Sequence, residues 1–509
     1  MKSLEPVRTA CIALGAAVLT ACTVGPAYRP PAAPQVPTYT AHALPGTISA
    51  ASGANGSQAV AQTLQRGATV NAQWWTAFAS PALNALVAQA LAHNPTLTAA
   101  QATLEQSRAE LKAAQGIFYP HVGVALGAER TRGNGAQAGP KANFGAQIYN
   151  LYTGQVNVSY NPGIFGLNRL VTRAAQAQVD LAADQLDAAR LTIAGNVVTT
   201  TLDLAALDEE LATTRRNVHS QQQALKLIRT QYQLGAVDQS EVFTQESLLA
   251  SSQAQLTQLA QARDSARHLL ATYLGEFPGK TSGLKTPRLA TITLPAQLPL
   301  SLPSQLVQQR PDIRAAEAQL RAANAQVGEA VARMYPNLQL TAAFGTQANL
   351  THTLFDPASR IWDIAAGLAA PLFEGGTLRA QKHAAQAAYR AVFADYQATV
   401  LDAFRNVADV LRALQHDSAL LGARARALHA AQDGLRLVTT QYQAGQVDFL
   451  SLLTSETQVQ TASVAFVAAK AQRLTDTAAL YTALGGGQWQ AATQAQPPAV
   501  KTADAEPGA

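Results

Sequence analysis

The chain has 509 residues, of which 48% are hydrophobic and only 14% are charged, whereas about a quarter charged is usual for globular proteins. Its net charge of +5 and its isoelectric point near 9.2 are mild for this length. Because phosphate binding requires clustered cations and the sequence contains no run of Lys and Arg, we expect no nucleic-acid partner. The polar surface must consist mainly of uncharged side chains.

The first 21 residues have the pattern of a secretory signal peptide. Two cations precede an apolar stretch, residues 10–21, that is too short to cross a bilayer as a helix. The stretch ends in the letters LTAC at residues 19–22, which resemble a bacterial lipobox. We therefore predict cleavage before Cys22 and a covalent N-acyl and diacylglyceryl lipid on it, the alternative being a small buried side chain. No other cofactor and no disulfide are expected.

The rest of the chain consists of two passes through one pattern. Asn94-Pro95 and Arg310-Pro311 each open a helical run that ends at a Tyr-Pro pair, and TQYQLGAVD at residues 230–238 returns as TQYQAGQVD 440 − 230 = 210 residues later. We predict the following segments: signal peptide 1–21, lipid-anchored extension 22–75, first repeat 76–275, linker 276–302, second repeat 303–485 and disordered tail 486–509.

Each Tyr-Pro pair is followed by alternating apolar residues, which predict one β-hairpin in each half and four strands in all. The alternative is a half-buried sheet of a soluble domain, because the transmembrane β pattern is weak in any one segment. The alternating residues are Val122, Val124, Leu126 and Ala128, then Val156, Val158 and Tyr160, then Leu338, Leu340, Ala342 and Phe344, and finally Trp362, Ile364, Ala366, Leu368 and Ala370.

Two long helices are predicted after the hairpins, from about Leu167 to Gln233 and from about Thr377 to Gln443. Each has an apolar residue every seven positions, which indicates helices packed lengthwise with a left-handed supercoil; a coiled-coil dimer stalk is the alternative. A second seam of the first helix contains polar residues, which predicts that the packed helices form a wall with one side exposed to water. The first seam comprises Val197, Leu204, Leu211, Val218, Leu225 and Tyr232, and the polar positions are Thr200, Thr214 and Gln221.

The repeated nonapeptide is interpreted as a reversal from one helix to the next. Its glycines suit the left-handed backbone conformation that often ends an α-helix, and its aspartates suit the N-cap of a new helix. Glu241 completes a capping-box pattern in the first copy, whereas Ser451 stands at that place in the second. The predicted tip-turn residues are Tyr232, Gly235, Asp238, Glu241, Tyr442, Gly445 and Asp448.

Several motifs together resemble the TolC-type outer-membrane efflux proteins, in their lipoprotein NodT/OprM branch. They are Trp74-Trp75, the block Arg310-Pro311-Asp312-Ile313, the two Tyr-Pro pairs, PLFEGG at residues 371–376 and both YQxG turns. The resemblance implies a mainly α protein with β structure: a homotrimer whose twelve-stranded outer-membrane β-barrel, with four strands from each chain, is continued by a long periplasmic α-helical barrel. It is consistent with the internal two-fold repeat.

The resemblance also implies a function and partners. We expect a passive outer-membrane channel for drugs or other small solutes, which works with a periplasmic adaptor, or membrane fusion protein, and an inner-membrane resistance-nodulation-division pump. The chain would contact outer-membrane lipid, and Thr23 after the lipidated Cys agrees with outer-membrane sorting. Selection of the exported solute is expected to reside in the pump.

A gate is expected beyond the second turn. Many relatives have Leu-Leu-Asp there, whereas this chain has Leu452-Leu453-Thr454, so an acidic ring at that place is in doubt. Ser451 and Thr454 are the candidate gate residues.

Two other classes of function are less consistent with the sequence. An enzyme is disfavoured because the nine His residues are scattered and no HExxH, CxxC or nucleotide-binding loop is present, so no catalytic residue and no metal site are predicted. A periplasmic adaptor-type coiled-coil lipoprotein is the alternative function. An adaptor would have one helical hairpin within a lipoyl-like domain, which the duplicated pattern disfavours.

Overall fold

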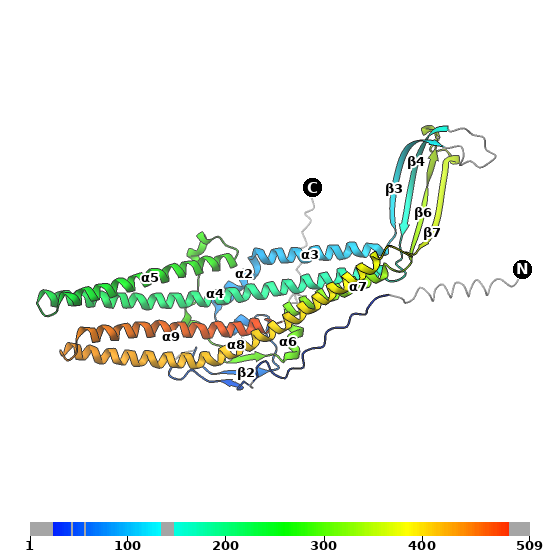
Figure 1. Ribbon diagram of the computed structural model, residues 1–509. Helices are drawn as coiled ribbons and strands as arrows, with labels where there is room; N and C mark the ends of the chain where they lie inside the picture. The colour runs from blue at the N-terminus through cyan, green and yellow to red at the C-terminus, as the bar shows by residue number, and fades with distance from the viewer. Residues whose placement is uncertain (1–23, 42–43, 55–57, 134–146, 488–509) are drawn as a thin grey trace, which may run out of the picture. The chain divides into compact units, whose positions relative to one another are not determined.

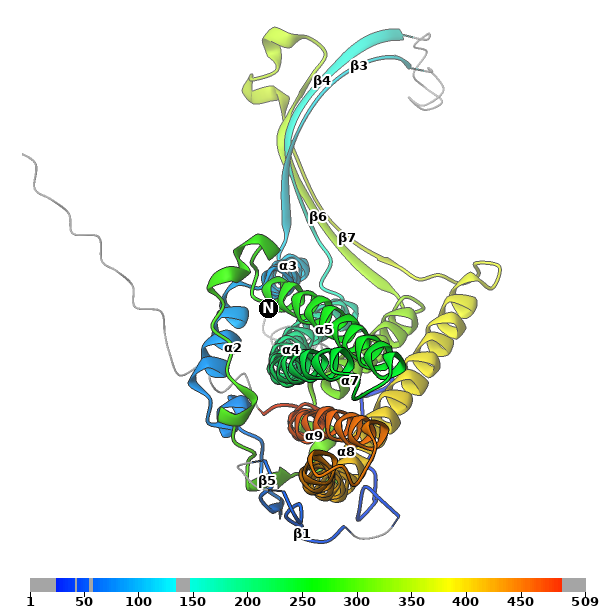
Figure 2. The ribbon, with the colours of Figure 1, turned by 90° about the vertical axis from the view of Figure 1, so that its left-hand side faces the viewer.

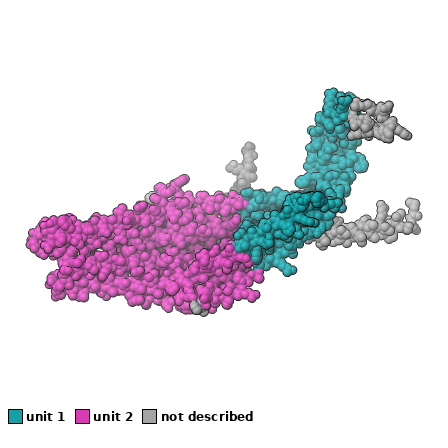
Figure 3. All heavy atoms as spheres, viewed as in Figure 1, with its two compact units in different colours: residues 1–31, 104–182, 316–396 teal, residues 32–103, 183–315, 397–509 magenta. Residues whose placement is uncertain are grey.

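The structure is a computed structural model that describes residues 24–41, 44–54, 58–133 and 147–487. Two compact units are present and are coloured separately in Figure 3. Unit 1 comprises residues 1–31, 104–182 and 316–396, and unit 2 comprises the remainder. Both units draw on both halves of the chain. The predicted signal peptide, the lipid site Cys22 and residues 488–509 of the predicted tail lie outside the described residues.

Unit 1 contains a four-stranded antiparallel sheet in the order β3-β4-β6-β7, which is visible in Figure 1. The strands are β3 (His121–Gly133), β4 (Gln147–Tyr160), β6 (Asn337–Ala348) and β7 (Arg360–Ala369). All four predicted strands are therefore present. The register pairs Val124 with Val156, Val156 with Phe344, and Phe344 with Trp362, so the alternating apolar residues share one face of the sheet.

Two helical hairpins dominate unit 2, and Figure 2 shows them end-on beside each other. The first is formed by α4 (Leu167–Gln233, 67 residues) and α5 (Gln239–Tyr273, 35 residues). The second is formed by α8 (Thr377–Gln443, 67 residues) and α9 (Phe449–Ala483, 35 residues). The N-terminal parts of α4 and α8 belong to unit 1. The predicted bounds of the long helices agree with the structure.

Each hairpin is joined to a further helix, which starts where the second helix of the hairpin, α5 or α9, ends. The helix α3 (Pro95–Gln115) starts beside the end of α5, where Asn94 Nδ2 donates to the carbonyl of Tyr273 at 2.9 Å. The helix α7 (Pro311–Ala332) starts beside the end of α9, where Arg310 Nη1 donates to the carbonyl of Ala483 at 2.8 Å. The two joints thus use different side chains for the same task, which is to satisfy carbonyls left unpaired at a helix C-terminus.

Glycine is favoured at both joints. Gly275 and Gly485 follow α5 and α9 with φ of +75° and +92°, a conformation that costs glycine no Cβ clash. A Cβ at Gly275 would lie 2.4 Å from the carbonyl oxygen of His93, and one at Gly485 would lie 3.1 Å from Cα of Arg310. At Gly275 the chain therefore approaches His93 too closely for any side chain, whereas at Gly485 the contact with Arg310 is tight and the positive φ adds to the preference for glycine.

The main core lies in unit 2, where aromatic residues and the heptad seams meet. Trp74 stacks on Tyr481 with ring centroids 5.4 Å apart, and Phe78 is fully buried beside them. A small sheet in the order β1-β2-β5 covers this core. The remaining elements are β1 (Thr47–Ile48), β2 (Gln62–Arg66), β5 (Gln297–Leu300), α2 (Pro81–His93), α6 (Pro303–Gln309) and short 3-10 turns at Trp74–Phe78, Gly116–Phe118, Pro278–Gly283, Leu289–Thr291, Thr351–Thr353 and Pro357–Ser359.

Two expectations about the long helices need correction. Val197 to Leu225 are buried along the seam as predicted, but Tyr232 is 43% exposed and does not finish it. The polar positions predicted to face water, Thr200, Thr214 and Gln221, are buried. Gln221 lies against the second hairpin, where its Nε2 donates to Gln460 Oε1 at 3.4 Å. The mixed seam is therefore buried rather than exposed to water, and at Gln221 it makes a polar contact with the second hairpin.

A fully buried arginine ties the second hairpin to the segment before β2. Arg473 on α9 donates to the carbonyls of Gln58 and Val60 at 3.0 and 2.8 Å. Asp417 on α8 lies near this guanidinium and is hydrogen-bonded to Asp476. Burial and the contact with Asp476 raise the pKa of Asp417 to about 7, although Arg473 opposes the shift.

This shift predicts pH-dependent stability. Unfolded Asp417 loses its proton near pH 4, whereas the folded protein keeps it to about pH 7, so the group stabilises the fold at low pH and this contribution is lost as the pH rises from about 4 to 7. We expect Asp417→Asn to raise the apparent melting midpoint at pH 8 by roughly 2 °C or more. The gain should shrink towards pH 5, as measured by heat denaturation in detergent. Asp433→Asn, at an exposed position of α8, is the control, and identical pH profiles for Asp417→Asn and the unmodified protein would contradict the prediction.

Candidate functional site

The turns between the paired helices have the same backbone geometry. Gly235 and Gly445 have φ of +74° and +72°, the left-handed conformation that the nonapeptide predicts. In the first turn the N–H of Ala236 donates to the carbonyl of Gln231 at 2.8 Å, and in the second the N–H of Gln446 donates to the carbonyl of Gln441 at 2.9 Å. Both turns thus satisfy the carbonyls at the end of a 67-residue helix.

The caps of the two returning helices differ, and not as the sequence predicts. Asp448 accepts hydrogen bonds from the backbone N–H of Ser451 at 2.9 Å and from its hydroxyl at 2.5 Å. Asp238 makes no side-chain cap hydrogen bond, so the capping box predicted with Glu241 is absent at this helix start. The pattern of residue types was right for a box, but the side-chain rotamers that complete it are not determined by spacing.

The carboxyl groups of the two turns lie close enough for the charge of one to shift the pKa of another. Partial burial raises the pKa of Glu241, and the carboxylates of Asp238 and Asp448 raise it further. The two hydrogen bonds from Ser451 lower the pKa of Asp448. The structure therefore brings Asp238, Glu241 and Asp448 from both turns into one acidic group at the tip of unit 2.

An apolar cluster holds the two hairpins together next to this acidic group. Leu225, Ile228 and Val242 of the first hairpin pack with Phe449 and Leu453 of the second. Tyr442 packs on the same cluster, its ring 6.1 Å from that of Phe449. Beside this cluster a hydrogen bond also joins the two hairpins, because Tyr442 Oη donates to Gln231 Oε1 at 3.3 Å. Sequence inspection did not single out Gln231, although it belongs to the repeated nonapeptide, because its partner Tyr442 is 211 residues away in the chain.

The predicted gate residues lie in the first two turns of α9. The hydroxyl of Ser451 is used by the cap of Asp448. The hydroxyl of Thr454 donates to the carbonyl of Leu450 at 2.8 Å, and its side chain is exposed. Ser451 thus contacts the acidic group through Asp448, whereas the printed bond of Thr454 goes to the backbone of its own helix, and the role of both residues at a gate stays a prediction.

The faces of the four-stranded sheet are chemically opposite. One face exposes large apolar side chains, among them Leu126 (85% exposed), Ile364 (78%) and Trp362 (73%). Alternation places Gln155, Asn157, Gln339 and Thr341 on the other face. Within the described residues β3 pairs along one edge with β4 and β7 along one edge with β6, so each has a second edge without a strand partner.

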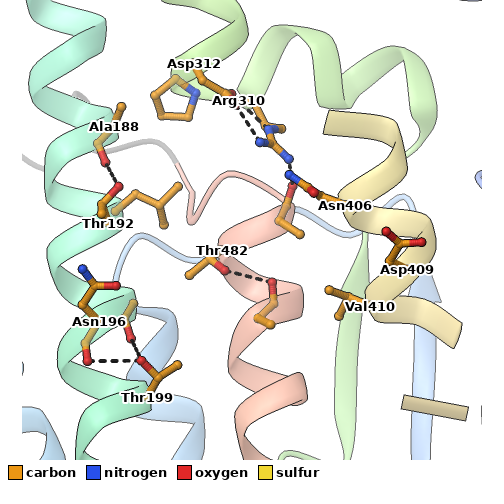
Figure 4. Close-up of a pocket in the computed structure, with 15 residues that line it drawn as sticks. Ala188, Thr192, Asn196, Thr199, Arg310, Asp312, Asn406, Asp409, Val410 and Thr482 are labelled. Atoms are coloured by element: carbon orange, nitrogen blue, oxygen red, sulfur yellow. Dashed lines mark hydrogen bonds and ion pairs between the residues drawn. The ribbon is translucent and has the colours of Figure 1, made fainter. Parts of the chain in front are cut away.

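A cavity of about 490 Å³ lies beside the joint at Arg310 (Figure 4). The Arg310 guanidinium binds both carboxylate oxygens of Asp312, at 3.0 and 2.6 Å, in addition to the carbonyl of Ala483. Asp409 of α8, which also lines the cavity, is ion-paired with Arg405 at 3.6 Å. The charged groups of the cavity are satisfied by neighbours, so the arrangement is structural.

Over the described ranges, no helix combines the length and the apolar composition needed to cross a bilayer. No set of three or more His, Cys, Asp or Glu side chains in that part of the chain is arranged to hold a metal ion.

Comparisons with known proteins identify the family. A family model described as outer membrane efflux protein matches residues 86–276 and 302–486. The chain belongs to this family. The pyoverdine export outer membrane protein OpmQ of Pseudomonas putida is 31% identical over 428 residues, which cover 82% of this chain and 88% of the relative. The cation efflux system protein CusC of Escherichia coli K12 is 26% identical over 481 residues, which cover 94% and 98%.

A solved structure gives the same result for the fold. The outer-membrane channel OprN superimposes with a TM-score of 0.81 at 26% identity, covering 92% of this chain and 99% of that protein. The predicted TolC-type resemblance is confirmed, and the chain is an outer-membrane efflux channel with a mainly helical fold and some sheet. Its relatives are channels and efflux proteins rather than enzymes, and the adaptor alternative is set aside.

Because the hydrogen bond between Tyr442 and Gln231 joins the two hairpins, we expect its removal to change the fraction of time for which the efflux channel is open. Tyr442→Phe removes the one described hydrogen bond that joins the hairpins at the tip and leaves the apolar cluster in place. A hydrogen bond of this kind contributes about 1 kcal/mol, so we expect the open fraction in planar bilayers to increase by about fivefold. Tyr232→Phe, at the equivalent exposed position of the first turn, is the matched control. Equal open fractions for both variants would show that this bond does not hold the hairpins together.

Proposed function

We propose that this efflux channel works as a homotrimer in a tripartite pump. In this arrangement each copy lends β3, β4, β6 and β7 to a twelve-stranded outer-membrane barrel, and the helices of the three copies continue it as a periplasmic tunnel. The observation that supports the proposal is the sheet itself, which has one exposed apolar face, one polar face and two open edges.

Lipid makes closure of this sheet necessary. A strand edge in hydrocarbon leaves N–H and C=O groups without partners, and no water is available to satisfy them. Four strands are too few to close, since the smallest familiar membrane barrels have about eight. Several copies would therefore contribute, and the family resemblance supports three. The equal helix lengths of the two hairpins, 67 and 35 residues in each, are consistent with two repeats of one unit, at residues 76–275 and 303–485.

The polar face of the sheet is suited to passive conduction. Gln155, Asn157, Gln339 and Thr341 offer hydrogen bonds without charge, and the described strands add two acids to this face, Glu129 and Asp363, so most of the face lets a solute pass without holding it tightly. The relatives' names mention pyoverdine for one and cations for another, which agrees with a conduit whose cargo is chosen by the pump. We propose no cofactor and no catalytic step in this chain.

Further parts of the proposal concern anchoring and partners. A lipid on Cys22 would fix the N-terminus in the outer membrane. The tip turns would face a periplasmic adaptor, which connects the channel to an inner-membrane resistance-nodulation-division pump. In the assembled trimer the acidic groups of three tips would surround the aperture, with Ser451 and Thr454 as its candidate lining.

The test is reconstitution of the purified, acylated protein in planar bilayers, together with its mass in detergent. We expect a trimer by native mass spectrometry and discrete single-channel steps that need no energy source. Heat should convert the trimer band to a monomer band on gels. A protein that stays monomeric and gives no conductance steps would refute the proposal.

A further inference from the structure

Charged residues on the sheet are segregated by face. The described strands contain the arginines Arg130, Arg132 and Arg360 and the acids Glu129 and Asp363. Arg130 and Arg132 continue the alternation of Val122, Val124 and Leu126, and Arg360 continues that of Trp362 and Ile364. Because neighbouring residues of a strand point to opposite faces, all three arginines share the apolar face and both acids lie on the polar face.

The arginines Arg130 and Arg360 also lie at the same level. Arg130 is 130 − 121 = 9 residues from the start of β3, and Arg360 is 369 − 360 = 9 residues from the end of β7. At about 3.3 Å per residue this is about 30 Å along the strand, or about 23 Å of height for a strand tilted by about 40°. That height matches the roughly 25 Å apolar band of outer-membrane barrels. Both guanidinium groups therefore lie at the outer margin of the band, away from the helices.

The strands that carry these arginines are the two edge strands. In the proposed trimer, β7 of one copy pairs with β3 of the next, so Arg360 of one copy meets Arg130 and Arg132 of its neighbour at the same level. All three side chains are exposed, and within the described residues none of them forms an ion pair. Three like charges at a seam are unfavourable unless an anion lies between them.

We propose that each seam between neighbouring copies binds the phosphate groups of a phosphorylated lipid in the outer leaflet. Guanidinium groups hold phosphate through paired, charge-assisted hydrogen bonds, which ammonium groups do not match. The same face continues as Leu126, Ile364 and Trp362, against which the acyl chains of that lipid lie. This apolar continuation is why the occupant is a lipid rather than a free phosphate ion. The inference rests on the proposed trimeric barrel.

The bound lipid joins two copies and so stabilises the trimer. We test this with delipidated trimer in detergent, to which a diphosphorylated glycolipid of the lipid A type or its dephosphorylated form is added. We expect up to one phosphorylated lipid per seam by native mass spectrometry, a higher temperature of trimer dissociation, and at least about tenfold weaker binding of the dephosphorylated form. This comparison needs no variant. Equal binding of both forms would overturn the inference.

Variants then locate the site. The triple variant Arg130→Gln, Arg132→Gln, Arg360→Gln should lose the lipid-dependent stabilisation and keep its single-channel conductance, because the arginines face lipid and not the lumen. The matched control replaces exposed arginines of the helices by Gln, namely Arg108, Arg215 and Arg424. It should behave as the unmodified protein does. Unchanged lipid binding by the triple variant would overturn the inference, and if that variant fails to assemble, Arg360→Gln alone serves the same comparison.

The remaining outcomes separate the possible failures. Stabilisation by inorganic phosphate equal to that by the lipid would assign the arginines to free anions and overturn the lipid site. A conducting trimer that binds no phosphorylated lipid would remove this inference and leave the proposed function intact. A monomer without conductance would remove both.

Discussion

The four-stranded sheet of this efflux channel cannot exist alone in lipid, and the rest of the molecule is consistent with that constraint. Its apolar face needs hydrocarbon, whereas the edges of β3 and β7 need partners for their N–H and C=O groups. Each requirement excludes a different simple solution: water would satisfy the edges but not the face, and lipid would satisfy the face but not the edges. Closure with further copies, as proposed, satisfies both, and it also brings the arginines of the two edge strands to one seam.

The helical part meets a comparable requirement with two hairpins of equal length. Their contacts change along α4, from the apolar seam at Val197 to the polar contact between Gln221 and Gln460 and then to the apolar cluster around Ile228. Buried amides that find partners specify one register, because a slip would leave them unpaired. At the joints, Asn94 and Arg310 satisfy the same orphan carbonyls with different side chains. The two halves therefore share geometry, while they differ in the side chains at their joints and in the caps at their tip turns.

Sequence reasoning predicted the periodic elements well and the individual side-chain contacts poorly. The bounds of α4 and α8, the four strands and both left-handed glycines follow from period, Pro and Gly, which act locally. The capping box at Asp238, the seam position of Tyr232 and the wet flank at Thr214 were wrong, because each depends on side-chain rotamers or on tertiary packing that sequence spacing does not determine. Gln231 and Arg473 were missed for the same reason: their partners are 211 and 415 residues away in the chain.

Covalent trapping of the edge strands tests most directly whether copies of this chain close the sheet. The variant Val124→Cys, Ala366→Cys places one thiol on each edge strand, on the same face and three residues from the helical end of its strand. Treatment of membranes with a short bismaleimide should give linked dimers and trimers that resist boiling in detergent, while either single variant should remain monomeric. Monomer alone from the double variant, with both thiols alkylated, would contradict pairing of β7 with β3 of a second copy.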